Sequence, residues 1–135
     1  MQQLGRRASF LLPLSFLGCS KTRSPEAAAA EFVDRYYVEK DHAKALDVSA
    51  DLAARRVQEE QHLLKEAGVG GPGAQPRVYY KLVRETDRKD DTELIYTMTI
   101  DAGGMKLQKE LRLLVKAFGK DFKVVSFAEN DVAAP

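Results

Sequence analysis

The sequence has one cysteine, Cys19, among its 135 residues. No thiol follows it, which excludes a disulfide framework and a thiolate metal site within one copy of the remaining chain. That part of the protein must therefore take its stability from a hydrophobic core. Its length is that of one ordinary domain, enough for a single two-layer core and too short for two.

The chain also lacks an excess of charge of one sign. Its 21 basic residues less Arg6 and Arg7, which precede the domain, leave 19 against 20 acidic residues. Such a balance produces no long-range field that would attract nucleic acid or an anionic surface. We expect no nucleic-acid partner.

A long apolar run is missing as well. The longest candidate, Phe10–Leu17, contains Pro13 and is far shorter than the ~20 residues of a membrane-spanning helix. A basic pair precedes this run, and Gly18 and Cys19 follow it directly, which is the order of a secretory signal. The segment resembles a bacterial lipoprotein signal peptide.

The resemblance implies cleavage before Cys19 and acylation of its sulfur, so that the lipid bilayer becomes a partner. Phe16 and Leu17 depart from the residues that this signal prefers three and two places before the cysteine. Ser20 stands where an inner-membrane retention signal has Asp, so the resemblance implies the periplasmic face of the outer membrane. An ordinary secretory signal cut elsewhere is the alternative. General secretion is favoured over twin-arginine export, because the twin-arginine pattern has apolar residues two places after the second arginine, where this chain has Ser9. The predicted organisation is a signal peptide (1–18), a tether (19–23), one domain (24–130) and a C-terminal tail (131–135).

The first half of the domain is predicted to be helical. Ser24 is a suitable N-cap before Pro25 and begins a helix whose apolar stripe includes Phe32, Tyr36 and Tyr37. Asp41 can cap a short second helix, and Ser49 or Asp47 a third. Leu52, Ala53, Val57, Leu63, Leu64 and Ala67 are predicted to form one apolar side of the third helix. Arg55, Arg56, Gln58, Glu59, Glu60 and Lys65 are interpreted as its solvated surface.

Residues 68–76 form a glycine-rich connector, and four segments of alternating polarity follow it. The predicted inward residues are Val78, Tyr80 and Leu82, then Leu94, Tyr96, Met98 and Ile100, then Met105, Leu107, Lys109, Leu111, Leu113 and Val115. The inward side of the fourth segment, at 122–128, is ambiguous. The connections are too short for crossover helices, so the sheet should be antiparallel. The fold class is therefore α+β, with N-terminal helices packed on one face of a curved antiparallel sheet of about four strands.

This order of elements, with Tyr36-Tyr37 and then Asp41-x-x-Lys44-Ala-Leu46 after an amphipathic helix, resembles the nuclear transport factor 2-like superfamily. The resemblance covers about residues 24–130 and implies a cone whose curved sheet encloses helices, often with a cleft at the wide end. Many members have an additional strand or hairpin among the helices, for which the glycine-rich connector leaves little room. Members include enzymes, transport adaptors and small secreted lipoproteins, so the fold does not select a function.

No catalytic or metal-binding motif is evident. His42 and His62 are interpreted as isolated surface histidines, and Glu59, Glu60 and His62 lack the spacing of a metal site. The glycine-rich connector has no lysine and no strand-to-helix context, so it is not a phosphate loop. We predict no catalytic residue, no metal and no cofactor.

One group of residues could line a ligand cleft: Tyr36, Tyr80, Tyr96, Met98 and Lys109. The alternative is a core that uses aromatic side chains near its rim. Lys109 interrupts an apolar face, so it either extends to the sheet edge, sits at a bulge or receives an anionic ligand. The leading hypothesis for function is a membrane-tethered, non-enzymatic interaction module of the cell envelope with a protein partner. The alternative is a domain that binds a small apolar ligand, or hydrolyses a substrate, in the cleft of the cone.

Overall fold

The computed structural model describes residues 24–67 and 76–132. Cys19, the signal peptide predicted before it and most of the glycine-rich connector lie outside the described residues. Within the described ranges no helix is both long and apolar enough to cross a membrane.

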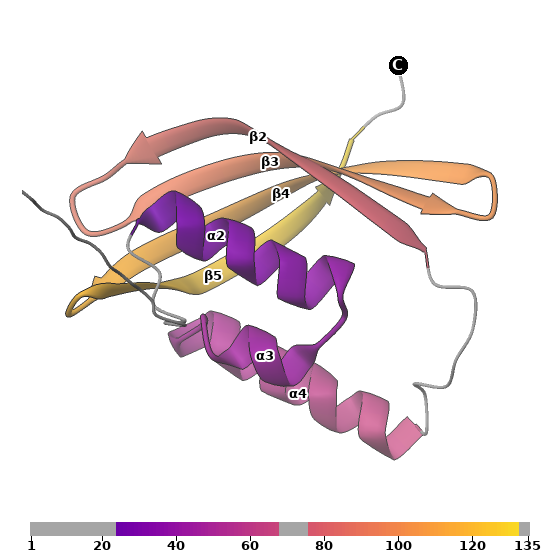
Figure 1. The fold of residues 1–135 in the computed structure, drawn as a ribbon, viewed down its shortest axis with the longest axis horizontal. Coiled ribbons are helices and arrows are strands. Elements are labelled where there is room, and N and C mark those ends of the chain that lie inside the picture. The colour runs from indigo at the N-terminus through magenta and orange to yellow at the C-terminus, as the bar shows by residue number, and fades with distance from the viewer. Residues whose placement is uncertain (1–23, 68–75, 133–135) are drawn as a thin grey trace, which may run out of the picture.

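The described chain forms a helical layer followed by a sheet (Figure 1). The helices are α2 (Pro25–Val33), the π-helix η2 (Asp34–Val38), α3 (His42–Leu46) and α4 (Asp51–Ala67). The strands are β2 (Arg77–Asp87), β3 (Thr92–Ala102), β4 (Met105–Phe118) and β5 (Asp121–Asp131). Each strand pairs antiparallel with the next, in the order β2-β3-β4-β5. The predicted α+β class with an antiparallel sheet of four strands is confirmed.

Two of the predicted helix caps are present. The Ser24 hydroxyl accepts a hydrogen bond from the Ala27 amide at 3.0 Å, and the Asp41 carboxylate accepts one from the Lys44 amide at 3.0 Å. The third predicted helix is present, but its predicted cap, Ser49 or Asp47, is wrong, because α4 begins at Asp51. Residues 48–50 instead run beside β5, where the Ala50 amide donates to the Val124 carbonyl at 2.9 Å. This short pairing covers part of the β5 edge.

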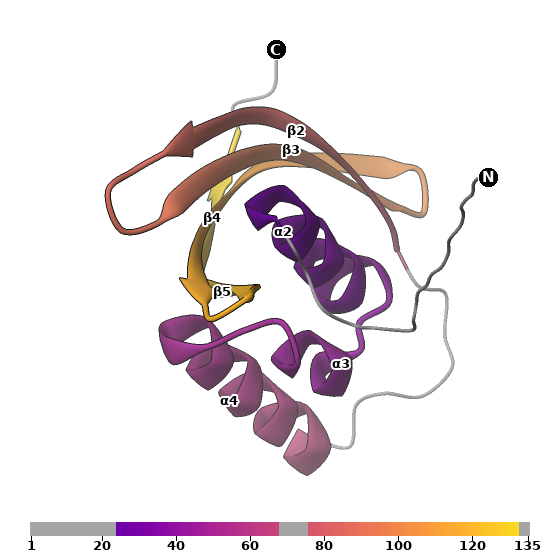
Figure 2. The same ribbon diagram turned by 60° about the vertical axis from the view of Figure 1, so that its left-hand side comes forward.

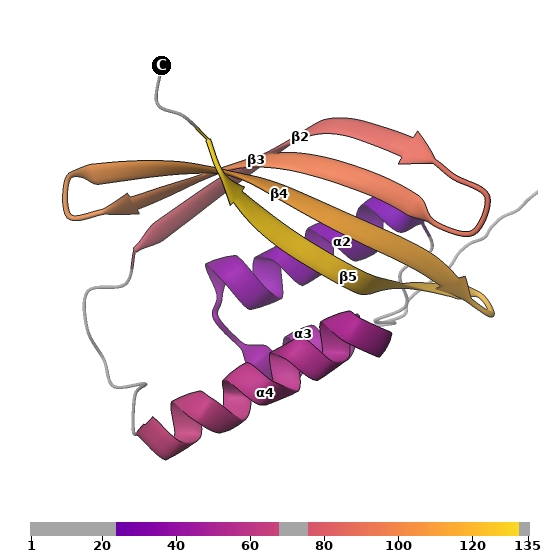
Figure 3. The ribbon, with the colours of Figure 1, turned by 180° about the vertical axis from the view of Figure 1, so that it is seen from behind.

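The sheet curls around α2, which fills its concave side (Figure 2). Phe32 and Val33 of α2 are fully buried against Leu94, Met98 and Leu111 of the sheet. The inward phase predicted for the first two strands is therefore confirmed. In Figure 3 α3 and α4 lie beyond α2, on the β5 side of the sheet.

A β-bulge in β5 explains why the fourth strand was ambiguous. On β5, Val124 pairs with Val115 but Ser126 pairs with Leu114, so Val125 is an additional residue. Val124 and Phe127 consequently both face the core, although they are three positions apart. A second bulge, at Val83, interrupts β2 between Leu82 and Arg84.

Two predicted apolar surfaces are wrong in part. On α4, Ala53 and Val57 are buried, but Leu52 and Leu63 are each 62% exposed and Leu64 is 39% exposed. On β4, Met105 and Leu107 have the inward phase, yet they are 67% and 50% exposed. Periodicity identified the correct phase in β4, but the strand extends beyond the helices that cover the sheet (Figure 1).

Candidate functional site

Most of the predicted cleft residues lie in the hydrophobic core. Tyr36, Tyr96 and Met98 are 8%, 2% and 0% exposed and belong to one cluster of buried side chains. Tyr80 is partly buried and packs against the same cluster. The structure thus brings these four residues together around α2.

The phenol groups of Tyr80 and Tyr96 lie side by side, and Tyr80 reaches the end of α2. Their rings meet edge to face at 5.7 Å, and the Tyr80 hydroxyl donates to Asp34 Oδ1 at 2.6 Å. Burial, followed by the hydrogen bond to Asp34, raises the pKa of Tyr80. Burial and the nearby charges of Glu26, Glu85 and Asp34 raise the pKa of Tyr96 to about 12. Its hydroxyl is buried without a hydrogen-bond partner among the described residues.

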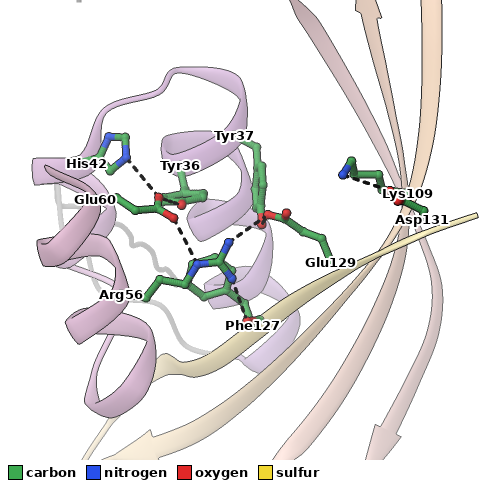
Figure 4. Close-up of polar contacts among 9 residues, drawn as sticks. All are labelled: Tyr36, Tyr37, His42, Arg56, Glu60, Lys109, Phe127, Glu129 and Asp131. Atoms are coloured by element: carbon green, nitrogen blue, oxygen red, sulfur yellow. Dashed lines mark hydrogen bonds and ion pairs between the residues drawn. The ribbon is translucent and has the colours of Figure 1, made fainter. Parts of the chain in front are cut away.

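Lys109 lies apart from this group. It is paired in the sheet with Met98, and its ammonium reaches Asp131 at 3.2 Å, near the end of β5. Neither bulge is at Lys109, so the bulge explanation is wrong. Figure 4 shows the Lys109–Asp131 pair separated from the polar side chains of the helical layer.

A second set of polar residues joins the helices to β5, and we call it the interlayer cluster. It consists of Tyr36, Tyr37, His42, Arg56, Glu60 and Glu129 (Figure 4). Arg56, on α4, is its centre: Nε lies 3.3 Å from Glu60, and the terminal nitrogens lie 3.5 Å from Glu129 and 3.2 Å from the Phe127 carbonyl. The guanidinium also stands over the Phe127 ring at 4.1 Å.

Two tyrosines and a histidine complete the interlayer cluster. The Tyr36 hydroxyl donates to Glu60 and the Tyr37 hydroxyl to Glu129. His42 Nε2 lies 3.7 Å from Glu60, and the imidazole meets the Tyr36 ring at 5.1 Å. The π-helix η2 contributes both tyrosines, which are consecutive in the sequence and both buried.

The electrostatics of the interlayer cluster follow from two carboxylates sharing one arginine. Burial, and then the charge of Glu129, raises the pKa of Glu60. Burial, and then the hydrogen bond to Glu129, raises the pKa of Tyr37 far above its ordinary value. Both carboxylates are engaged by phenol and guanidinium donors, so a substrate would have to displace these contacts. The arrangement ties η2, α3 and β5 to α4.

Sequence reasoning missed the interlayer cluster. His42 was interpreted as isolated, but its side chain is only 15% exposed and contacts Tyr36 and Glu60, so that interpretation is wrong. Arg56 and Glu60 were assigned to the solvated surface and are instead bound to β5 and η2. His62, which is 70% exposed beside Glu66, agrees with the surface interpretation. The four-residue spacing of Arg56 and Glu60 was a signal for their mutual pair, but none indicated Glu129.

Among residues 24–67 and 76–132, no group of three or more His, Cys, Asp or Glu side chains is placed to hold a metal ion. Two open hollows lie on the sheet, away from the interlayer cluster. One, of ≈ 540 Å³, lies over β2 and β3, and the other, of ≈ 520 Å³, lies where the ends of β4 and β5 meet. Of the predicted cleft residues, Tyr80 lines the first hollow and Lys109 the second.

No protein-family profile and no curated protein sequence matches the chain. Among solved structures, it is similar to a putative calcium/calmodulin-dependent protein kinase type II association domain from Thiobacillus denitrificans. The TM-score is 0.65 at 15% sequence identity, over 83% of this chain and 98% of the other. At that identity the likeness is one of fold alone. The shared fold is the one that the order of elements indicated, with helices packed against a four-stranded antiparallel sheet.

Proposed function

We propose that this protein is a non-enzymatic interaction module of the cell envelope, held at the periplasmic face of the outer membrane by an acylated Cys19. The N-terminal order of basic pair, apolar run, Gly18 and Cys19 supports the anchor. The interaction role is supported by the packing of the sheet's concave face, where the side chains of Phe32, Tyr96 and Met98 fill the space between α2 and the strands. Because core side chains fill that space, a polypeptide partner is bound on an exposed surface instead.

The anchor is tested by Cys19→Ser. Because the thioether requires the sulfur, the parent protein should partition into detergent and incorporate labelled palmitate, whereas the variant should do neither. Gly18→Ala keeps a small residue before the cysteine and serves as the control. Equal aqueous partitioning of the parent and Cys19→Ser would reject acylation.

One observation favours a second candidate, a site for a small apolar ligand or a hydrolysed substrate beneath α2. The buried Tyr96 hydroxyl has no hydrogen-bond partner among the described residues, and a ligand could supply one. Native mass spectrometry of the protein as purified distinguishes the two candidates. A stoichiometric small molecule that is lost from Tyr96→Phe would support the ligand site and contradict the filled-core interpretation.

A further inference from the structure

The outer face of the sheet, which points away from the helices, concentrates basic side chains. Residues on this face alternate with the core residues along each strand. Its basic residues are Arg77, Lys81, Arg84, Lys106, Arg112, Lys116 and Lys123. Its acidic residues are Glu93, Asp101, Glu110 and Asp121, of which Glu93 is already paired with Arg112. Residues 24–67 have the opposite bias, with ten acidic and six basic residues.

The two hollows meet at Thr99, which lines both. Tyr79, Lys81, Val83 and Thr97 of the outer face also line the first. Lys106 and Gln108 of the outer face line the second, together with Leu107, Lys109 and Asp131, which have the inward phase. We call the two hollows together the trough. Lys81 lies in one part of the trough and Lys106 in the other.

The shape of the trough selects the kind of partner. The sheet curls around α2, so its outer face is convex (Figure 2) and would meet a flat bilayer over a small area. A trough on a convex face can instead hold an extended chain. Tyr79 and Val83, which are 54% and 59% exposed, offer apolar contact, while Thr97, Thr99 and Gln108 offer hydrogen bonds to a main chain.

We propose that this trough binds an extended acidic peptide segment of an envelope protein, which specifies the partner class of the interaction module proposed above and rests on it. Carboxylates of the segment pair with Lys81 and Lys106, and an apolar side chain between them contacts Tyr79. Complementary charge of this kind accelerates association and selects the partner. Solvent-exposed ion pairs between lysine and carboxylate groups are weakened by salt.

The test uses the full chain in detergent and a fluorescein-labelled peptide of alternating glutamate and valine. Fluorescence anisotropy should show saturable binding that weakens as salt rises. Lys81→Glu and Lys106→Glu should each raise the Kd by about tenfold, and Tyr79→Ala by about threefold. The matched controls lie on α4: Lys65→Glu makes the same charge change, and Leu63→Ala removes a side chain of similar exposure. Both controls should leave the Kd unchanged.

Three results would overturn the proposal. Lack of saturable binding, or equal weakening by Lys65→Glu, would show that the trough does not recognise the peptide. Binding to phosphatidylglycerol vesicles that competes with the peptide and is lost in Lys81→Glu would assign the face to a bilayer. A dimer detected by sedimentation that excludes the peptide would assign it to a second copy. Failure of Cys19 acylation would leave peptide binding intact, so this test is separate from that of the anchor.

Discussion

The two faces of the sheet use alternate residues of the same strands, yet the described helices cover only one of them. On β3, Tyr96 and Met98 face α2 and are almost completely buried, whereas Thr97 and Thr99 between them face outward and border the trough. The inner face determines register, because a shift by one residue would expose the whole apolar set. The outer face is free of that requirement. Its positions can therefore carry basic and hydroxyl side chains, such as Lys81, Thr97 and Thr99.

The largest expected effect that distinguishes the faces is at neighbouring positions of β3. Tyr96→Ala should lower the free energy of unfolding by about 3 kcal/mol or more, because it leaves a cavity under α2. Thr97→Ala, on the outer face, should stay within about 0.5 kcal/mol of the parent. Tyr96→Phe should be neutral or stabilising, since it removes a buried hydroxyl that has no partner among the described residues. Urea unfolding measures all three, and a tolerated Tyr96→Ala would show that the inner face borders a void.

A smaller effect is expected where the helical layer joins β5. Arg56→Met keeps an apolar stem but removes the contacts to Glu60, Glu129 and the Phe127 carbonyl. We expect a loss of about 1 to 2 kcal/mol, moderated because the side chain is 37% exposed. Arg55→Met, at the exposed neighbouring position, is the control and should cost less than about 0.5 kcal/mol. Equal costs in thermal or urea unfolding would mean that the interlayer cluster does not hold the layers together.

The smallest effect concerns the pH dependence of the same junction. The pKa of Glu60 is raised by burial and by the charge of Glu129. A carboxyl whose pKa is raised by folding binds its proton more tightly in the folded protein than in the unfolded chain. Its contribution to the free energy of unfolding is therefore fully present below the ordinary pKa of Glu. That contribution is lost as pH rises through the folded-state pKa. Glu60→Gln should therefore gain stability relative to the parent as pH rises from about 4 to about 7. Unfolding at several pH values, with Glu59→Gln as the control, measures the trend, and a trend in the opposite direction would contradict burial as the dominant cause.

Local patterns in the sequence were sufficient for the order and type of the elements. Ser24 and Asp41 each cap a helix with their own side chains, and strand alternation assigned Tyr96 and Met98 to the inner face. These signals act over a few residues, so they are readable without the fold. Local patterns did not place the start of α4, because Ser49 is drawn into pairing with β5.

Tertiary structure alone decided which apolar positions are covered and which polar residues meet. Leu63 continues the apolar pattern of α4 but remains exposed, because no other described element covers that part of the helix. Arg56 and Glu129 are 73 positions apart, and they meet only because α4 packs beside β5. Likewise, the β5 bulge brings both Val124 and Phe127 into the core. Contacts between distant segments depend on the length and curvature of the elements that meet, which periodicity along a single segment does not encode.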